Sequence, residues 1–323
     1  MEKVSIVIPV FNVEKYLVDC LNSIFCQDYP CIEVIAINDG STDNSLKILL
    51  DYQARYPNFQ IINSSNQGLS IARNFGIENS SGEFIMFVDS DDVILPTTIS
   101  TSMRYFKKFS VDIVLFSGNA FADGSPDYLA NQMNYNRPSQ LVGKVFPTQL
   151  LFCEFVKSKN YIVSSCLFIA RRKYIGELTF KSNIYHEDNL FTTKLLLSEG
   201  KHSAICLSEQ FYQRRVRPNS TMTIDRNMKH IEGYITVAED LIAFNSKEAI
   251  YYSSLNKFIQ QMIMNSIHSS ILVFKFRLPV ELYINNIKLF FRTKVNFYWI
   301  KVLLFVVFPH FFLIRNYMSR FFR

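Results

Sequence analysis

Three carboxylates, Asp89, Asp91 and Asp92, directly follow an apolar run at residues 84–88. Such a run is typical of a short strand that is buried on both faces. Because like charges this close together repel each other, a positive group should lie beside them. Asp89 and Asp91 offer oxygen ligands that suit a hard divalent ion such as Mn²⁺ or Mg²⁺. The stretch therefore predicts a metal site; the alternative is that Asp91 or Asp92 only caps a helix that begins near Pro96.

The elements around these carboxylates predict an α/β fold. Strands are expected at 4–10, 32–37, 59–62, 84–88 and 112–116, and helices between them at 13–25, 45–56, 69–78 and 97–108. This alternation predicts a mostly parallel central sheet with helices on both faces. In open sheets of this kind, ligands bind at the carboxyl ends of the strands. The carboxylates therefore stand where a ligand is expected.

The rest of the chain predicts an acceptor half and a helical appendage. A polar stretch at 119–143 is expected to run over the surface, and long loops of this kind are more often functional than idle. It precedes a helix at 148–157, a strand at 162–170, a helix at 189–198 and two short strands at 202–207 and 210–215. From about residue 225 only helical patterns follow. We expect a domain over 1–222, with a nucleotide half at 1–118 and an acceptor half at 119–222, and then a helical region over 223–323.

Common nucleotide-binding loops are missing from the sequence. Pro9, Phe11 and their neighbours occupy the turn after the first strand, where a dinucleotide fold needs glycines, and no P-loop occurs. A bound nucleotide diphosphate would instead need a metal to neutralise it. Asp39, at the end of the second strand, either accepts hydrogen bonds from a base or ribose or only forms the turn before Gly40. Arg73, on a predicted helix, either reaches a phosphate, pairs with the carboxylates or is simply solvated.

The cysteines and the amino terminus predict a cytosolic protein. Six cysteines occur without a Cys-x-x-Cys pair, as expected of reduced core thiols and not of a zinc site. Met1 runs almost directly into a strand, so no secretory leader is expected.

The basic charge is concentrated in the tail. The net charge is +6, but residues 277–323 hold eight Lys or Arg and one Glu, a balance of +7. Nucleic acid binding by the main domain is therefore not expected. Aromatic and basic residues flank short apolar stretches in the tail at 292–323, which are too short to span a bilayer. This pattern predicts a helix lying on the inner face of the cell membrane, and the alternative is a docked helix or a homodimer seam.

Four blocks in the first hundred residues or so carry a family resemblance. They are Pro9-Val10-Phe11-Asn12-Val13-Glu14-Lys15-Tyr16-Leu17, Asn38-Asp39-Gly40-Ser41-Thr42-Asp43, Gly68-Leu69-Ser70-Ile71-Ala72-Arg73-Asn74 and Val88-Asp89-Ser90-Asp91-Asp92. In this order and spacing the chain resembles the family-2 glycosyltransferases of GT-A fold. Two later blocks extend the resemblance: His186-Glu187-Asp188-Asn189-Leu190-Phe191 and Tyr212-Gln213-Arg214-Arg215-Val216-Arg217-Pro218-Asn219-Ser220. Arg214 departs from the family, which often has an aromatic residue there.

The resemblance implies an inverting enzyme that moves a sugar from a nucleotide diphosphate, with a UDP-sugar favoured, to an acceptor hydroxyl. Asp39 would hold the base, Asp89 and Asp91 the ribose and the metal, and Asp188 would be the general base. The nucleotide-sugar site would include Pro9, Phe11, Glu14, Asp39, Arg73, Asp89 and Ser90.

The acidic pair and the arginines suit this chemistry. Inversion needs a base for the acceptor hydroxyl and positive charge for the departing diphosphate. Asp188, at a predicted helix start beside Glu187, suits the first task, although acidic helix starts are also common for their dipole alone. Glu187 is expected to orient an acceptor hydroxyl or an arginine. Arg215 and Arg217 alternate on a strand and would face the diphosphate together with Ser220, the alternative being a basic edge strand.

The expected setting is surface polysaccharide assembly, such as a capsule or lipopolysaccharide, with a glycan or lipid-linked acceptor and a hexosyl or N-acetylhexosaminyl donor. Two alternatives are a sugar-phosphate nucleotidyltransferase and a non-catalytic nucleotide-binding scaffold. The first usually has a glycine-rich, basic loop after strand one, which this chain lacks. The second does not explain the full set of acidic residues.

Overall fold

The computed structural model describes residues 1–218, 220, 223–244, 249–274 and 279–293. Contacts within the chain divide it into two units. The sheet unit comprises residues 1–183 and 191–224, and the helical unit comprises 184–190 and 225–323. The short segment 184–190, which the sequence grouped with the main domain, thus belongs with the C-terminal helices.

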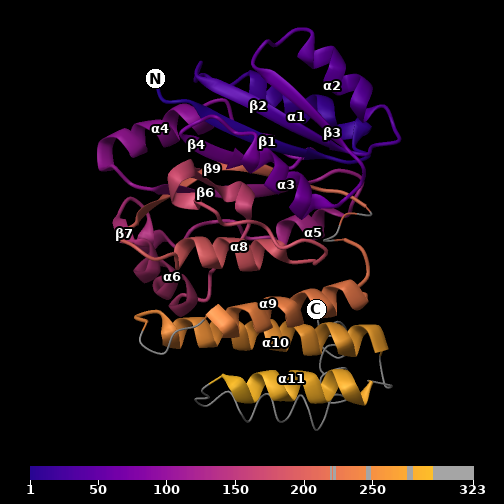
Figure 1. Cartoon of the computed structure of the whole chain (residues 1–323), viewed down its shortest axis with the longest axis vertical. Helices are drawn as coiled ribbons and strands as arrows, with labels where there is room; N and C mark the ends of the chain where they lie inside the picture. The colour runs from indigo at the N-terminus through magenta and orange to yellow at the C-terminus, as the bar shows by residue number, and fades with distance from the viewer. Residues whose placement is uncertain (219, 221–222, 245–248, 275–278, 294–323) are drawn as a thin grey trace. The chain divides into compact units, whose positions relative to one another are not determined.

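In the described part of the chain, nine strands form one sheet in the order β3-β2-β1-β4-β8-β6-β9-β5, with β7 beside β9. The first four in this order are parallel: β3 (Phe59–Ser64), β2 (Ile32–Asp39), β1 (Val4–Val10) and β4 (Phe84–Phe87). Every residue of β1 and β4 is buried, as expected for apolar runs covered on both faces. The expected mostly parallel sheet flanked by helices is confirmed (Figure 1).

The other half of the sheet is mixed in direction. β8 (Phe168–Arg171) is antiparallel to β4 and to β6 (Ile113–Ala122), and β9 (Ser203–Val216) is parallel to β6. Two short strands, β5 (Val93–Ile94) and β7 (Val145–Pro147), are antiparallel to β9.

Two strand predictions in this half were wrong. The strands expected at 202–207 and 210–215 form the single strand β9, because the ladder with β6 continues across a register shift between the pairs Leu115–Cys206 and Ser117–Gln210. The strand expected at 162–170 is extended only over β8, and a 3₁₀ turn at Ser165–Leu167 precedes it.

The helices of the sheet unit are α1 (Glu14–Phe25), α2 (Ser45–Gln53), α3 (Leu69–Glu78), α4 (Thr98–Phe109), α5 (Asp127–Asn131), α6 (Thr148–Lys157), α7 (Arg172–Ile175) and most of α8 (Glu187–Leu196). α3 lies against β1 at Gly76, where an added Cβ would stand 2.1 Å from a Val7 methyl group. Only glycine permits this approach, which sets α3 and its Arg73 close to the sheet.

The stretch 119–143 is less superficial than predicted. It contains the end of β6, helix α5 and a 3₁₀ turn at Ser139–Leu141. Arg137 is buried, and its guanidinium donates to the backbone carbonyls of Phe116 and Leu167 at 3.0 Å each. This internal arginine ties the stretch to the core, because carbonyl oxygens satisfy its buried donors.

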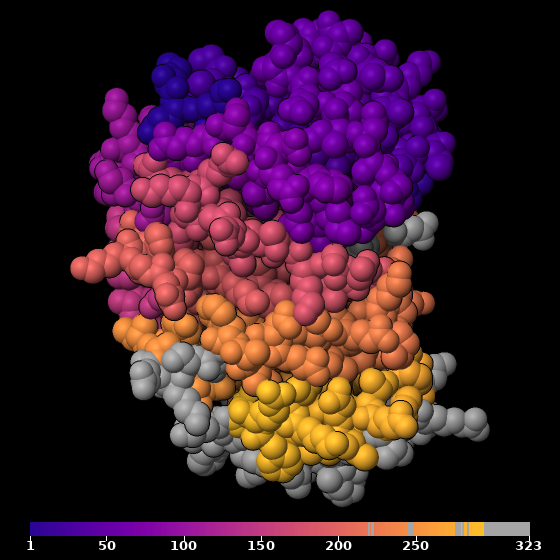
Figure 2. All heavy atoms as spheres, viewed as in Figure 1, coloured from indigo at the N-terminus to yellow at the C-terminus, as the bar shows by residue number. Residues whose placement is uncertain are grey.

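The helical unit is built from α9 (Met228–Phe244), α10 (Tyr252–Phe274) and α11 (Val280–Arg292), which pack on one another as successive layers (Figure 1). Side chains of α10 and α11 meet side by side on the face seen in Figure 2. Among the described helices, none combines the length and the apolar character that crossing a bilayer requires. The predicted membrane-binding tail at 292–323 lies outside the described residues, apart from its first two positions.

Candidate active site

Asp89 is held by a buried arginine at the carboxyl end of β4. Nη2 of Arg73 donates to Asp89 Oδ1 at 2.8 Å, and the Arg73 side chain is 1% exposed. The guanidinium also lies 5.2 Å from the centre of the Phe180 ring. Burial alone would raise the pKa of Asp89, but the charges of Arg73 and Arg214, together with the hydrogen bonds from Arg73 and Cys166, hold this pKa below its ordinary value. Of the roles considered for Arg73, the structure shows the pairing with a carboxylate.

Asp91 pairs with the last arginine of the β9 region. Arg217 Nε donates to Asp91 Oδ2 at 2.7 Å, and Arg215 Nε donates to the Asp91 backbone carbonyl at 2.8 Å. Both guanidinium groups lie over the ring of Tyr16, at 5.3 Å for Arg217 and 5.0 Å for Arg215. The positive group that charge repulsion predicted beside the carboxylates is therefore present, and it comes from a distant part of the sequence.

Asp92 is the structural member of the three carboxylates. It is 2% exposed, accepts a hydrogen bond from the Tyr212 hydroxyl at 2.7 Å and accepts another from the Arg215 amide at 2.7 Å. Burial and the neighbouring charge of Asp91 raise its pKa to about 8. The first residue before α4 is Thr97, without a side-chain cap, so the alternative that Asp91 or Asp92 caps this helix is wrong.

Arg215 joins four parts of the sheet unit. Besides Asp91, its guanidinium donates to Asp123 at 2.5 Å and to Asp19 at 2.9 Å. It also lies 4.9 Å from the centre of the Phe121 ring. Because its donors are taken by carboxylates and a carbonyl, Arg215 orients the loop at Asp91, whereas Arg217 is the more exposed of the two, at 22%.

Arg214, the departure from the family pattern, lies within the unit. Its guanidinium stands 5.6 Å from the Tyr135 ring centre. Burial lowers the pKa of Arg214, but the negative potential of Tyr135, Asp92 and Asp89 more than reverses this and raises it. Arg214 therefore adds a permanent positive charge behind the carboxylates.

Asp39 anchors the start of α3. Its carboxylate accepts from the amides of Gln67 and Gly68 at 2.8 Å each and from the Ser64 hydroxyl at 3.2 Å, and Asp39 is 4% exposed. It thereby fixes the helix that carries Arg73. The structure shows this anchoring role, and hydrogen bonding of Asp39 to a nucleotide base stays a prediction.

The first block places Glu14 between two helix starts. Its carboxylate accepts from the Asn44 amide at 2.8 Å, at the start of α2, while the Asp43 carboxylate accepts from the Glu14 amide at 2.9 Å, at the start of α1. Pro9 is buried within β1, beside Ile37 of β2. Phe11 is 45% exposed after β1 and Ser90 is buried after β4, both at the sheet edge where the parallel strands end.

Glu187 and Asp188 form the first turn of α8, and both are half-buried. They lie in the segment 184–190 and so belong to the helical unit. The Ser220 hydroxyl shares a hydrogen bond of 3.1 Å with the Thr223 hydroxyl. The roles of these three residues in catalysis and acceptor or diphosphate binding stay predictions.

The oxygen donors at Asp89 and Asp91 fit a divalent cation only in part. Among the described residues, no group of three or more His, Cys, Asp or Glu side chains is arranged to hold a metal. Each carboxylate has one oxygen paired with an arginine, Oδ1 of Asp89 and Oδ2 of Asp91. Hard carboxylate oxygens suit Mn²⁺ or Mg²⁺, which usually also take substrate phosphate oxygens as ligands. Asp91 and Asp89 would thus hold a cation together with a nucleotide diphosphate.

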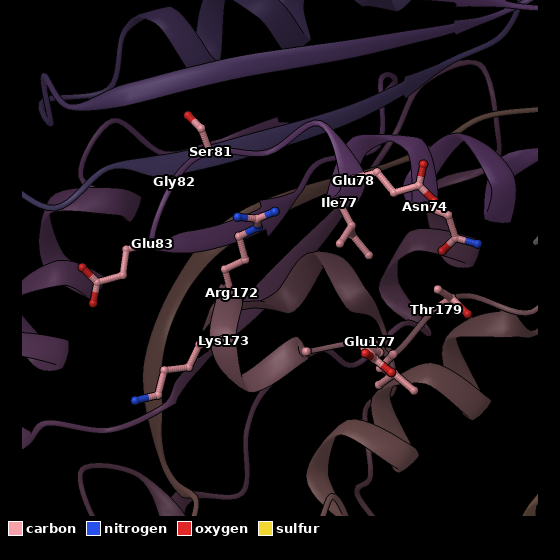
Figure 3. A pocket seen from close by; sticks show the side chains of 12 residues that line it. Asn74, Ile77, Glu78, Ser81, Gly82, Glu83, Arg172, Lys173, Glu177 and Thr179 are labelled. Atoms are coloured by element: carbon pink, nitrogen blue, oxygen red, sulfur yellow. The ribbon is translucent and has the colours of Figure 1, made fainter.

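A separate cavity of about 630 Å³ lies at the opposite end of β4 (Figure 3). Glu83, which precedes β4, lines it together with Arg172, Lys173 and Glu177 around α7. In Figure 3 the Lys173 side chain extends away from Glu177. Because Asp89 follows the other end of the same strand, this cavity is no part of the carboxylate site.

Sequence reasoning did not find Asp19, Asp123 and Tyr212 as members of the site. Asp123 comes from the polar stretch expected to lie over the surface, and Asp19 from the exposed side of α1. Tyr212 begins the block at 212–220 that carries part of the family resemblance, and this position was the only sequence feature that pointed to it.

Comparison with known proteins shows relatives of this chain in sequence and in fold. The family model described as "Glycosyl transferase family 2" matches residues 5–179. Glycosyltransferase GlyA of Streptococcus pneumoniae is 30% identical over 68% of this chain and 31% of GlyA, and the uncharacterized glycosyltransferase YibD of Escherichia coli is 26% identical over 80% of this chain and 76% of YibD. The chain thus spans about a third of GlyA. The structure of S. aureus TarS 1–349 in complex with UDP has a TM-score of 0.62 at 21% identity over 89% of each chain, a likeness of fold.

Proposed function

The chain belongs to glycosyl transferase family 2, and from this membership we propose that it transfers a sugar, with inversion, from a UDP-sugar to a hydroxyl of a glycan or lipid-linked acceptor. The reaction would use Mn²⁺ or Mg²⁺ and serve the assembly of a surface polysaccharide such as a capsule or lipopolysaccharide. The sugar transferred would be a hexose or an N-acetylhexosamine. The UDP complex of TarS supports the choice of nucleotide.

The observation that carries the proposal is the pairing of Asp89 with Arg73 and of Asp91 with Arg217 where the parallel strands end. The buried Arg73 fixes one Asp89 oxygen. A carboxylate held in this way is preorganised, so binding costs less conformational freedom. Ligands of open α/β sheets bind at this edge.

The acidic residues of the two motifs and of the nucleotide site have separate tasks in the proposed reaction. The bound cation, held by Asp91 and Asp89, would supply positive charge to the departing diphosphate. Asp39 would accept from the base, Asp89 would also accept from the ribose, and the neighbourhood of Phe11 and Glu14 would border the nucleotide. Asp188 would take the proton of the acceptor hydroxyl as the hydroxyl attacks the anomeric carbon from the face opposite the leaving group.

Arg217 has a further part in this scheme. Its positive charge is balanced by Asp91 at 2.7 Å. A cation at Asp91 would take over that balance, and the planar guanidinium suits diphosphate oxygens. Arg215, with its donors already taken by Asp123 and Asp19, would stay in place and keep the loop fixed.

Calorimetric titration of UDP in the presence of Mn²⁺ tests the proposal. We expect wild type to bind UDP only with the cation present, and Asp91→Asn to weaken this binding roughly ten- to a hundredfold because a ligand charge is lost. Asp51→Asn, an exposed change on α2, is the matched control and should bind as wild type does. The metal-assisted donor site would be refuted if wild type bound UDP as tightly with a chelator as with Mn²⁺, and if Asp91→Asn bound UDP as tightly as wild type. A panel of UDP-, GDP- and dTDP-sugars in a transfer assay then identifies the donor.

We also propose that the tail at 292–323 holds the protein at the inner face of the cell membrane. The proposal rests on the sequence, in which basic residues flank aromatic and apolar stretches. The full chain should sediment with vesicles that contain phosphatidylglycerol and not with pure phosphatidylcholine vesicles. Paired charge reversals at Lys301 and Arg315 should abolish this, and binding that is unaffected by them would contradict the electrostatic account.

A further inference from the structure

The segment that carries the acidic pair rests on α9 through stacked rings. The His186 ring stacks on the Tyr234 ring with their centres 3.8 Å apart and an angle of 13° between their planes. The Tyr185 ring meets the His230 ring edge-on, at 4.9 Å and 82°. All four residues belong to the helical unit. Aromatic contacts of this kind fix ring orientation as well as burying area.

Gly233 lets the backbone of this segment approach α9 closely. A Cβ at Gly233 would stand 2.3 Å from the Tyr185 carbonyl oxygen and 3.0 Å from its carbonyl carbon. Glycine inside a helix destabilises the helix relative to alanine. The contact explains why a glycine stands inside α9, because any side chain at this position would collide with the Tyr185 carbonyl.

His186 itself is held in an unfavourable backbone conformation. Its φ is 69°, in the left-handed region that non-glycine residues rarely adopt. The His186 carbonyl accepts from the Asn189 amide at 3.0 Å, which starts α8. A strained residue of this kind persists only where its surroundings hold it, and here the surroundings are Tyr234 and His230.

The His186 ring acts as a neutral aromatic group. Burial lowers its pKa to about 3, and electrostatic interaction with His230 and Arg226 acts in the same direction. Near neutral pH the ring is therefore uncharged and suited to lie flat on Tyr234. Its role is one of packing, because a neutral ring offers no charge to a phosphate or a carboxylate.

We infer that α9 is the platform that fixes Glu187 and Asp188, with Gly233, Tyr234 and His186 as positioning residues for the general base. The inference rests on the proposed function for the role of Asp188. A general base must lie within hydrogen-bonding reach of its proton, and a displacement of about 1 Å can cost roughly a hundredfold in rate.

Variants of α9 test this platform. Tyr234→Ala removes the stacked ring, Tyr234→Phe keeps it, and Gly233→Ala forces the Tyr185 backbone away. The matched control is Glu232→Ala, at an exposed position of the same turn. Each variant is compared with wild type in three measurements: hydrogen–deuterium exchange of residues 184–190, kcat and KM for transfer, and the Kd for UDP with Mn²⁺.

We expect Tyr234→Ala and Gly233→Ala to raise exchange in 184–190 and to lower kcat about a hundredfold, with the UDP Kd changed by less than about twofold. Tyr234→Phe and Glu232→Ala should behave as wild type. If UDP binding and the melting temperature fall in step with kcat, the platform is merely structural and the inference fails. Should Tyr234→Ala not fold, Tyr234→Leu carries the same test, because it fills space without an aromatic face.

The outcome separates the inference from the function on which it rests. Full transfer activity in Asp188→Asn would refute the assignment of the base. Unchanged exchange of 184–190 in both Tyr234→Ala and Gly233→Ala would refute the platform, whatever the reaction is.

Discussion

The two acidic motifs of this chain are held in place by different forces. In the sheet unit, Asp89 and Asp91 are each paired with an arginine at 2.8 and 2.7 Å. In the helical unit, the backbone before Glu187 and Asp188 is fixed by the stacking of His186 on Tyr234 and by the close approach of the Tyr185 backbone to Gly233. The first motif is therefore positioned by charge, and the backbone that leads into the second is positioned by shape.

This difference suits the two tasks. A site that receives a cation and a diphosphate needs charged groups that can change partners. Asp91 and Arg217 form such a pair, because a cation could replace Arg217 at Asp91 and a phosphate could replace Asp91 at Arg217. A general base needs an exact position, and a backbone fixed by packing supplies that position. The two motifs should consequently fail in different ways when they are altered.

The largest effect is expected at the motif positioned by shape. Asp188→Asn keeps the size of the side chain and removes the base, so kcat for transfer should fall about a thousandfold. The Kd for UDP should stay within about twofold of wild type, because the nucleotide is proposed to bind in the sheet unit. Glu199→Gln, at an exposed position after α8, is the control. A parallel loss of UDP binding would show that the two motifs are not separable.

The next largest effect concerns the motif held by charge. Arg73→Met should lower the free energy of unfolding by about 3 kcal/mol, since it leaves Asp89 without its buried partner. This is the lower end of the range for buried pairs because the Asp89 side chain is 27% exposed. Denaturant unfolding measures the change. The double variant Arg73→Met/Asp89→Asn should recover part of the loss, and no recovery would mean that packing against Phe180 and not charge is what the arginine supplies.

The next effect is expected from pH at the stacked ring, and per pH unit it is smaller than the loss in Arg73→Met. His186 has a pKa of about 3 in the folded chain against 6.5 in a free side chain, so below pH 6.5 the unfolded chain binds a proton that the folded chain does not. The contribution of the neutral ring to stability is complete above pH 6.5 and is lost as the pH falls toward 3, by at most about 1.4 kcal/mol per pH unit. The rings of His230 and Tyr234 lie against His186, and the electrostatic effects of His230 and Arg226 act in this same direction.

His186→Phe isolates this contribution, because it keeps an aromatic face and removes the titrating group. Stability curves between pH 7 and pH 4 should be flatter for the variant than for wild type. Curves that run parallel over this range would show that the ring takes up its proton without leaving Tyr234.

Much of the sheet unit was predictable from local pattern. The apolar runs of β1, β2 and β4 predicted buried parallel strands, and all three formed. The demand for a positive group beside Asp89 and Asp91 followed from charge repulsion alone, and Arg73 and Arg217 meet it. Pattern and elementary electrostatics were sufficient because both act over short distances.

Contacts set by register were not predictable. The pairing of Asp92 with Tyr212 joins residues 120 positions apart and depends on how β9 lies against β5. A bulge also shifts the register between β6 and β9, and no local pattern reveals it. The contact at Gly233 is a similar case, because a glycine in a helical pattern does not reveal which backbone segment will pack against it.

The smallest effect is expected at Glu14, and it tests how far the charge-positioned region extends. Glu14→Ala removes two acceptor contacts with Asn44, at 2.8 and 2.7 Å, from the start of α2. Loss of a capping contact should lower the free energy of unfolding by about 1 kcal/mol. Asp43→Ala, which removes the reciprocal contact with the Glu14 amide, should lower it by a similar amount. If Glu14 supports the nucleotide only by fixing these helix starts, both variants should change the UDP Kd by less than about threefold. A much larger loss in Glu14→Ala than in Asp43→Ala would instead make Glu14 a direct nucleotide contact, and the charge-positioned site would then reach from Asp91 to the first turn of α1.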